Sequence, residues 1–145
     1  MTDEQPPSPQ PPPEASLTRF EAVLFDLDGV ITPTAEVHMR AWARLFEPFL
    51  EDRGVEPYQE KDYFAYIDGR PRYEGVQALL EARGIEVPYG SPDDDPDAET
   101  VCGLGNRKNK AFMEVLEAEG VTAYPGSVRL VDSLIERGTA VACVS

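Results

Sequence analysis

Two aspartates separated by a single leucine are the residues whose types and spacing could do chemistry. Asp26 and Asp28 follow the apolar run 23–25, which predicts a buried strand, and Gly29 then lets the chain turn. In an extended chain, side chains two residues apart point the same way and stand about 6–7 Å apart. Two carboxylates so placed can work on opposite sides of one phosphorus atom. Their repulsion favours a cation between them, and Mg²⁺, which binds a few carboxylates together with substrate phosphate, is the expected metal.

A simpler interpretation of this stretch is a strand that happens to end in an acidic turn, because Asp and Gly are ordinary turn residues. The flanking pattern favours a functional site. A strand-like apolar run precedes the aspartates, and Thr32 and Thr34 lead from the glycine turn into an amphipathic helical pattern.

Composition and charge limit the classes of function. The 145 residues carry a net charge of −14, and 41% are hydrophobic, which fits one ordinary domain with its own core. Such an acidic chain is not expected to bind nucleic acid or anionic membranes. No apolar run has the length of a membrane span, and no secretory signal is evident. The two cysteines, of which Cys143 is expected to be a buried thiol, fit a reducing cytoplasm. We also expect a monomer, although no residue pattern specifies the oligomeric state.

The aspartates must be positioned by a strand and by helices that follow it. We expect a disordered proline-rich tail over 1–18, because this composition has little apolar surface to bury. The predicted elements are a strand at 19–28, helices at 34–47, 73–83, 106–119 and 127–137, a short aromatic helical turn at 62–66, an acidic loop at 85–99, and a strand at 140–144. Thr32 and Ser127 are candidate N-caps, and Pro48 is expected to end or kink its helix.

The order of these elements predicts an α/β fold with an all-helical insertion between two core strands. The expected boundaries are 19–32 for the first part of the core, 33–122 for the insertion and 123–145 for the second part. The last helix and strand have the spacing of a parallel α/β crossover.

The motif FDLDGV at 25–30 resembles the first motif of the haloacid dehalogenase (HAD) superfamily of phosphotransferases. The run LFDLDGVITPTAEVHMRAW at 24–42, with RKN at 107–109 and YPGS at 124–127, is similar to its β-phosphoglucomutase branch. The resemblance implies a partial Rossmann-like HAD core of parallel strands with an inserted helical cap. It also implies a small sugar-phosphate substrate and Mg²⁺ as cofactor.

The resemblance carries roles to individual residues of the core. Asp26 aligns with the nucleophile that forms an aspartyl-phosphate, and Asp28 with the general acid/base. Both positions align with Mg²⁺ ligands, Asp26 through its carboxylate and Asp28 through its backbone carbonyl. Ser145 falls where the second motif, which holds the transferring phosphate, begins; a serine after the last strand is the simpler interpretation.

Four residues of the expected cap align with positions that approach the substrate. Arg72 aligns with an arginine that grips the distal phosphate, and Gly69 and Lys108 align with substrate contacts. His38 aligns with a histidine near the site. Each has a structural alternative, such as a surface arginine or a satisfied histidine on an apolar helix face. Lys108 is expected at a helix start, where the dipole favours anions, although a solvated basic helix start is equally consistent.

Two departures from the family pattern limit the functional expectation. Pro33 stands where the family usually has aspartate, which removes a carboxylate and an N–H from the segment before the first helix. The lysine of the third motif and the acidic residues of the fourth are also missing. We therefore expect a C-terminally truncated fragment that is inactive alone and folds poorly in its core half.

Within this family the favoured activity is that of a β-phosphoglucomutase, which converts β-glucose 1-phosphate to glucose 6-phosphate. A sugar-phosphate phosphatase on the same scaffold is the nearest alternative. A non-catalytic binding module, with the proline-rich tail as its interaction element, is the alternative from another class.

Overall fold

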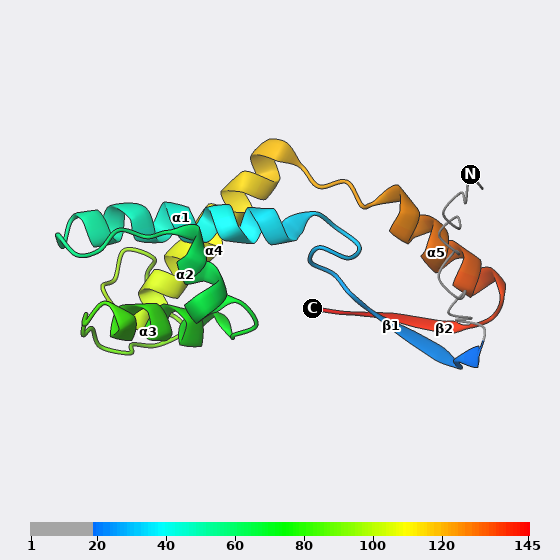
Figure 1. Ribbon diagram of the computed structural model, residues 1–145, viewed down its shortest axis with the longest axis horizontal. Helices are drawn as coiled ribbons and strands as arrows, with labels where there is room; N and C mark the ends of the chain where they lie inside the picture. Colours follow the sequence, from blue (N-terminus) through cyan, green and yellow to red (C-terminus); the bar gives the residue numbers. More distant parts are fainter. Residues whose placement is uncertain (1–18) are drawn as a thin grey trace, which may run out of the picture.

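The computed structural model describes residues 19–145, so the expected disordered tail at 1–18 lies outside the described residues. The elements in chain order are β1 (Ala22–Asp26), α1 (Thr34–Glu51), α2 (Glu60–Asp62), the π-helix η2 (Tyr63–Ile67), α3 (Arg72–Ala82), α4 (Val101–Glu119), α5 (Pro125–Glu136) and β2 (Ala140–Val144). Figure 1 shows α1 to α4 gathered at one end of the molecule and the strands with α5 at the other.

The two strands pair in parallel, with Ala22 opposite Ala140 and Asp26 opposite Val144. Helix α5 leads into β2, which confirms the predicted crossover and the α/β class. Strand β1 is shorter than the predicted 19–28 because the chain turns directly after Asp26.

The expectation of a fully buried strand, and of a buried Cys143, was wrong. Of the residues in the two strands only Phe25 is buried, whereas Leu24 is 70% exposed. The Cys143 thiol is exposed as well. A two-stranded sheet with one helix beside it leaves much of its surface uncovered, so the apolar character of these strands is not matched by burial within residues 19–145.

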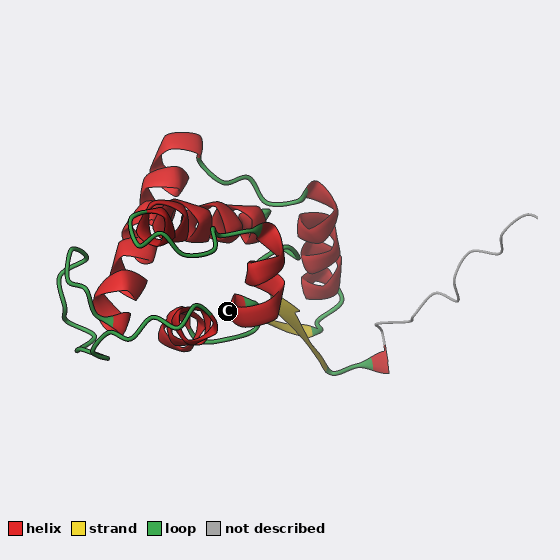
Figure 2. Cartoon of the chain, turned by 60° about the vertical axis from the view of Figure 1, so that its left-hand side comes forward, coloured by secondary structure: helices red, strands yellow, loops and turns green. Residues whose placement is uncertain are grey.

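The helical end has its own hydrophobic core. The buried cluster draws on α1, η2, α3 and α4, and comprises Trp42, Leu45, Phe46, Phe49, Leu50, Ile67, Val76, Leu79, Leu80, Val101 and Leu104. Figure 2 shows these helices enclosing a common centre, with the strands to one side. We call this end the cap, residues 34–119, and the strands with α5 the core half.

Helix α1 passes through Pro48, which was predicted to end or kink it, and continues to Glu51. Pro48 cannot donate to the carbonyl four residues earlier. That position lies on the exposed side, where water can satisfy the carbonyl. Phe49 and Leu50, which follow, are 4% and 0% exposed, and their burial offsets the missing hydrogen bond.

Helix α4 begins five residues before the predicted start, at Val101. The Thr100 side chain caps it by accepting a hydrogen bond from the Gly103 N–H at 2.9 Å. Gly103 and Gly105 both lie inside this helix, although glycine is unfavourable there. A Cβ on Gly103 would stand 2.4 Å from the Ala98 carbonyl oxygen.

The predicted N-caps of the other helices were wrong. Pro33, not Thr32, is the N-cap of α1, and no side chain completes that cap. Helix α5 begins at Pro125, which places Ser127 in the first turn. The Ser127 hydroxyl instead donates to the Val30 carbonyl at 2.6 Å.

Two segments connect the cap to the core half, and they are bonded to each other. The Ser127–Val30 hydrogen bond lies beside a second one, from the Tyr124 N–H to the Ile31 carbonyl at 2.8 Å. The two connecting segments, one between β1 and α1 and the other between α4 and α5 (Figure 1), are therefore joined to each other and are not independent linkers.

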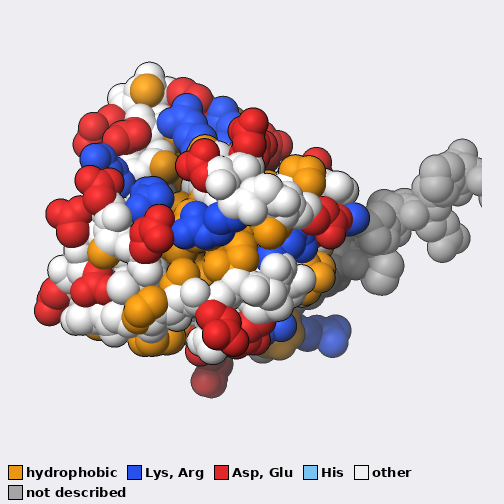
Figure 3. Space-filling model, turned by 90° about the vertical axis from the view of Figure 1, so that its left-hand side faces the viewer, with side chains coloured by type: hydrophobic (Ala, Val, Ile, Leu, Met, Phe, Trp, Pro, Cys, Tyr) orange, Lys and Arg blue, Asp and Glu red, His pale blue; other side chains and the backbone are white. Residues whose placement is uncertain are grey.

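The predicted helical turn near residues 62–66 is present as α2 and η2, and the acidic segment 85–99 has no helix or strand. Acidic and basic side chains intermix on the cap face drawn in Figure 3. Among the described residues, no helix combines the length and apolar character needed to cross a membrane.

Candidate active site

One cavity of about 450 Å³ lies between the cap and the ends of the two strands. All seven residues singled out from the sequence line it: Asp26, Asp28, His38, Gly69, Arg72, Lys108 and Ser145. They come from both halves of the molecule, so the cavity depends on how the cap sits over the core half. Asp26, Asp28 and Ser145 belong to the core half, and the other four to the cap.

The two aspartates are held by a tight turn. Asp26 is the last residue of β1, and its Oδ1 accepts a hydrogen bond from the Leu27 N–H at 2.8 Å. Asp28 lies beyond the strand, where the N–H groups of Ile31 and Thr32 both donate to the Leu27 carbonyl at 3.0 Å. Gly29, at φ +78°, closes this turn. The chain is therefore not extended through Asp28, and the simple alternating geometry assumed from the sequence was wrong.

The Asp28 carboxylate is contacted from two sides by helix α1. The Thr34 hydroxyl donates to Asp28 Oδ1, and the hydroxyls of Thr32 and Thr34 share a hydrogen bond at 2.8 Å. The Nε2 atom of His38 lies 3.6 Å from Asp28 Oδ2. The first turn of α1 thus orients the carboxylate without a contribution from Pro33.

Lys108 completes a connected series of polar groups from the cap to Asp28. Its Nζ atom lies 2.6 Å from His38 Nδ1. Burial, and then the Arg72 charge, lowers the pKa of Lys108 to about 8. Burial, and then Lys108, lowers the pKa of His38. At neutral pH the protonated Lys108 therefore donates to Nδ1 of a neutral His38, which places the imidazole proton on Nε2, facing Asp28.

The position of Lys108 differs from the one predicted. It lies two turns inside α4 rather than at a helix start, so the helix-dipole argument does not apply to it. Aromatic side chains hold the ammonium group instead, because Lys108 Nζ lies 5.2 Å from the centre of the Trp42 ring and 4.9 Å from that of Phe112. Phe112 also stacks on His38, with ring centres 4.2 Å apart.

Arg72 and Gly69 enter the cavity from the segment before α3. Gly69 has φ +73°, a left-handed conformation that favours glycine. Arg72 is the first residue of α3, and its Nη2 donates to the Tyr73 hydroxyl at 3.1 Å. The Arg72 Nε atom is buried and has no hydrogen-bond partner among residues 19–145.

Three further polar residues line the cavity and were missed by sequence reasoning: Tyr63, Asp68 and Arg70. Asp68 and Arg70 flank Gly69, so the DGR segment itself was the available signal. Burial and the nearby Asp68 and Asp28 carboxylates raise the pKa of Tyr63. Tyr63 is therefore a neutral hydroxyl at the cavity wall.

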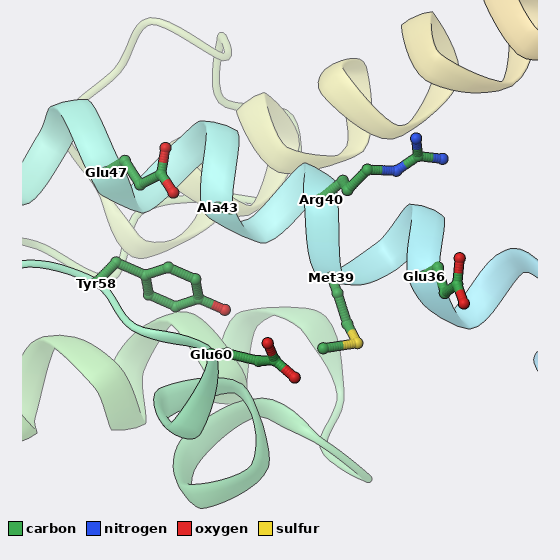
Figure 4. A pocket seen from close by; sticks show the side chains of 7 residues that line it. All are labelled: Glu36, Met39, Arg40, Ala43, Glu47, Tyr58 and Glu60. Atoms are coloured by element: carbon green, nitrogen blue, oxygen red, sulfur yellow. The ribbon is translucent and has the colours of Figure 1, made fainter.

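A second cavity, of about 400 Å³, lies between α1 and the segment that leads into α2 (Figure 4), and none of the predicted site residues line it. Its lining residues are Glu36, Met39, Arg40, Ala43, Glu47, Tyr58 and Glu60. Arg40 is bound to Glu119 at 2.8 Å. Burial and nearby acidic groups, Asp62 first, raise the pKa of Tyr58, so its hydroxyl stays protonated. The paired aspartates and the buried cation make the first cavity the better candidate.

The donor set at the strand end fits a magnesium ion. Asp26 and Asp28 both line the cavity, and within residues 19–145 no group of three or more His, Cys, Asp or Glu side chains could hold a metal. Mg²⁺ requires no such cage, because it is commonly held by one or two carboxylates together with water and substrate phosphate.

The chain belongs to the family of haloacid dehalogenase-like hydrolases, whose model matches residues 20–145. This confirms the superfamily assignment made from the FDLDGV motif.

The most informative relatives are enzymes of phosphorylated sugars. A beta-phosphoglucomutase of Mycobacterium tuberculosis is 44% identical over 135 residues, which cover 88% of this chain and 51% of that protein. A phosphorylated carbohydrates phosphatase of Thermotoga maritima is 37% identical over 67 residues, covering 46% of this chain and 28% of that protein.

Among solved structures, CbbY from Rhodobacter sphaeroides in complex with phosphate superimposes with a TM-score of 0.56. The match covers 86% of this chain and 50% of that chain at 22% sequence identity, which is evidence for the fold alone. The present chain thus spans about half the length of the beta-phosphoglucomutase and of CbbY.

Proposed function

We propose that the protein to which these residues belong transfers a phosphoryl group on a sugar phosphate, most specifically as a β-phosphoglucomutase. The observation that carries the proposal is the single cavity in which the two core aspartates face the cap residues His38, Arg72 and Lys108. The 44% identity to a beta-phosphoglucomutase supports the choice of substrate class.

Asp26 is the nucleophile in this proposal. Its carboxylate attacks phosphorus and forms an aspartyl-phosphate, while the leaving oxygen takes a proton. It stands at the end of a strand, where the backbone is fixed, and only one of its oxygens is bonded to the adjacent N–H. The other oxygen remains available for attack.

Asp28 is the general acid/base, which protonates the leaving oxygen and later removes the proton of the incoming hydroxyl. The Thr34 hydroxyl and the His38 ring orient it. Because Thr34 and His38 belong to α1, the position of the cap determines the position of the proton-transfer group.

The cap residues bind the second phosphate of a bisphosphate intermediate. Arg72 and Lys108 supply two positive charges on the cap side of the cavity. Ser145 lies on the core side, where it would hold the transferring phosphate. Mg²⁺, held by Asp26 and the Asp28 position, would neutralise charge on the transferring group.

The test is an assay of the protein expressed from its complete gene with β-glucose 1-phosphate, Mg²⁺ and a trace of glucose bisphosphate. Accumulation of glucose 6-phosphate supports the mutase. Asp26→Asn should abolish turnover because it removes the nucleophile. Asp28→Asn should lower kcat by about 10²–10⁴-fold because it removes proton transfer. Asp132→Asn, an exposed change on α5, is the matched control and should leave the rate unchanged.

A sugar-phosphate phosphatase is the second candidate, favoured by the resemblance to the Thermotoga maritima phosphatase. The same assay separates the two, since a phosphatase releases inorganic phosphate in place of glucose 6-phosphate. Turnover that persists in Asp26→Asn would contradict both, and absence of any turnover in the wild type would favour a non-catalytic binding module.

A further inference from the structure

The Arg72 guanidinium is the end point of a hydrogen-bonded chain that starts outside the cavity. Arg72 Nη2 donates to the Tyr73 hydroxyl at 3.1 Å, and that hydroxyl donates to Asn106 Oδ1 at 3.0 Å. Asn106 Nδ2 donates in turn to the backbone carbonyls of Pro92 and Asp94, at 3.0 Å and 2.9 Å. This chain of hydrogen bonds thus connects three separate segments, namely α3, α4 and the acidic loop 85–99.

The donor and acceptor of every hydrogen bond in this chain follow from which groups can donate and which can only accept. Both amide hydrogens of Asn106 are used by carbonyl oxygens, which can only accept. Its Oδ1 must therefore face the Tyr73 hydroxyl, and that hydroxyl must donate to it. The lone pairs of the Tyr73 oxygen are then left to accept from Arg72, which can only donate. No alternative arrangement satisfies all four groups.

The acidic loop is fixed firmly enough to serve as an anchor. The Asp94 carboxylate accepts hydrogen bonds from the Ser91 N–H at 3.1 Å and the Thr100 hydroxyl at 2.6 Å, and these bonds lower the pKa of Asp94. Thr100 is also the N-cap of α4. The loop carbonyls that bind Asn106 are therefore tied to the start of the same helix that carries Asn106.

The Tyr73 ring has little room to move. A Cβ on Gly105 would stand 2.6 Å from its Cδ1 atom, so the ring lies directly against the α4 backbone. The Arg72 guanidinium carbon lies 4.9 Å from the centre of the same ring. The Tyr73 ring and the Tyr73 hydroxyl therefore both restrict the position of the Arg72 guanidinium.

We propose that Tyr73 and Asn106 are positioning residues, which hold the Arg72 guanidinium in the orientation that binds a substrate phosphate in the main cavity. The proposal rests on the proposed function for the identity of the ligand, but its geometry requires only a phosphate. Neither Tyr73 nor Asn106 lines the cavity, so both act through Arg72. A guanidinium held in place loses less side-chain freedom on binding than a free one.

The first test is Tyr73→Phe in the protein expressed from its complete gene, which removes the hydroxyl and keeps the ring. We expect KM for β-glucose 1-phosphate to rise about five- to tenfold with kcat nearly unchanged, because binding to a non-reacting phosphate is weakened. Tyr89→Phe, in which the tyrosine is exposed in the acidic loop, is the matched control and should leave KM unchanged.

A double-mutant cycle separates positioning from a structural role. Arg72→Ala should raise KM by itself, and adding Tyr73→Phe to Arg72→Ala should raise it no further. Asn106→Ala should reproduce the Tyr73→Phe effect. An equal loss from Tyr73→Phe in the presence and absence of Arg72 overturns the proposal, as does an unchanged KM in Tyr73→Phe.

A calorimetric titration with inorganic phosphate tests the proposal without turnover. Weaker phosphate binding by Tyr73→Phe than by wild type supports positioning even if the wild type proves inactive on sugar phosphates, in which case the proposed function alone fails. Equal binding by the two proteins, or none by the wild type, overturns the positioning proposal while any measured mutase activity stands.

Discussion

Lys108 is a buried cation whose neighbours keep it close to losing its charge. His38, Arg72 and Asp28 are the ionisable groups that face it: burial and the Arg72 charge disfavour the protonated form, whereas Asp28 and the hydrogen bond to His38 Nδ1 favour it. An anion in the cavity would supply the missing stabilisation.

The lowered pKa of Lys108 predicts a pH dependence for phosphate binding. Below about pH 8 the side chain is protonated and attracts phosphate; as the pH rises through 8 the charge and this attraction are lost. We expect the Kd for a sugar phosphate to increase about tenfold between pH 7 and 9.5, the effect of one charged hydrogen bond. Titration calorimetry across this range measures it.

Lys108→Met is the control for that experiment. It should bind weakly at every pH and show no transition near pH 8. A transition of the same size in wild type and Lys108→Met would contradict the assignment to Lys108.

The residues of the candidate site could be predicted from the sequence, but the contacts between them could not. The motif and its family resemblance indicated seven of the residues that line the cavity, but not Tyr63, Asp68 or Arg70. The Lys108–His38 contact depends on how α1 packs on α4, which no local pattern specifies. Tyr73 was predicted only as a helix residue, because the partner of its hydroxyl lies thirty-three positions away, on α4.

Among the elements, a buried ion pair ties α2 to the end of α3. Arg83 Nη2 lies 2.6 Å from Asp62 Oδ2, and the two side chains are 6% and 3% exposed. Arg83 also donates to the backbone carbonyls of Glu56 and Pro57, at 3.1 Å and 3.4 Å, so one side chain holds the loop before α2 as well.

Breaking this pair should destabilise the cap. Asp62→Ala leaves the buried Arg83 charge without its carboxylate, and we expect the free energy of unfolding to fall by about 3 kcal/mol. Urea denaturation measures the change. Glu56→Ala, which removes an exposed pairing with Lys61, is the control and should cost at most about 1 kcal/mol. Equal losses in the two variants would contradict the special role of the buried pair.

Element types were predictable from periodicity, whereas element ends were not. The apolar faces of α1, α3 and α5 follow the helical repeat, and β2 matches its predicted range. Pro48 and the glycines of α4 stand inside helices because their local preferences are outweighed by contacts along the rest of the helix. Burial of Phe49 and Leu50, and close approach of Tyr73 to Gly105, are tertiary effects.

For the whole molecule, stability is expected to be unevenly divided between the two ends. The buried hydrophobic cluster lies entirely in the cap, whereas four of the five β2 residues are exposed. Hydrogen exchange on the 145-residue chain should therefore show slow amides in α1, α3 and α4 and much faster ones in β1 and β2. Protection of the strands equal to that of α1 would contradict this expectation and the earlier one that the core half folds poorly.

The double crossing between cap and core half restricts how the two ends can move. A domain attached through a single connecting segment can rotate about several axes. Two crossings bonded through Tyr124–Ile31 and Ser127–Val30 resist twisting and leave bending about the line between them as the easy motion. We expect a bend of the cap about this line to separate Asp28 from His38 and Thr34, because those two residues belong to α1 of the cap. Opening of the cavity and loss of the Asp28 alignment are then expected to occur together, because residues of both halves line the cavity.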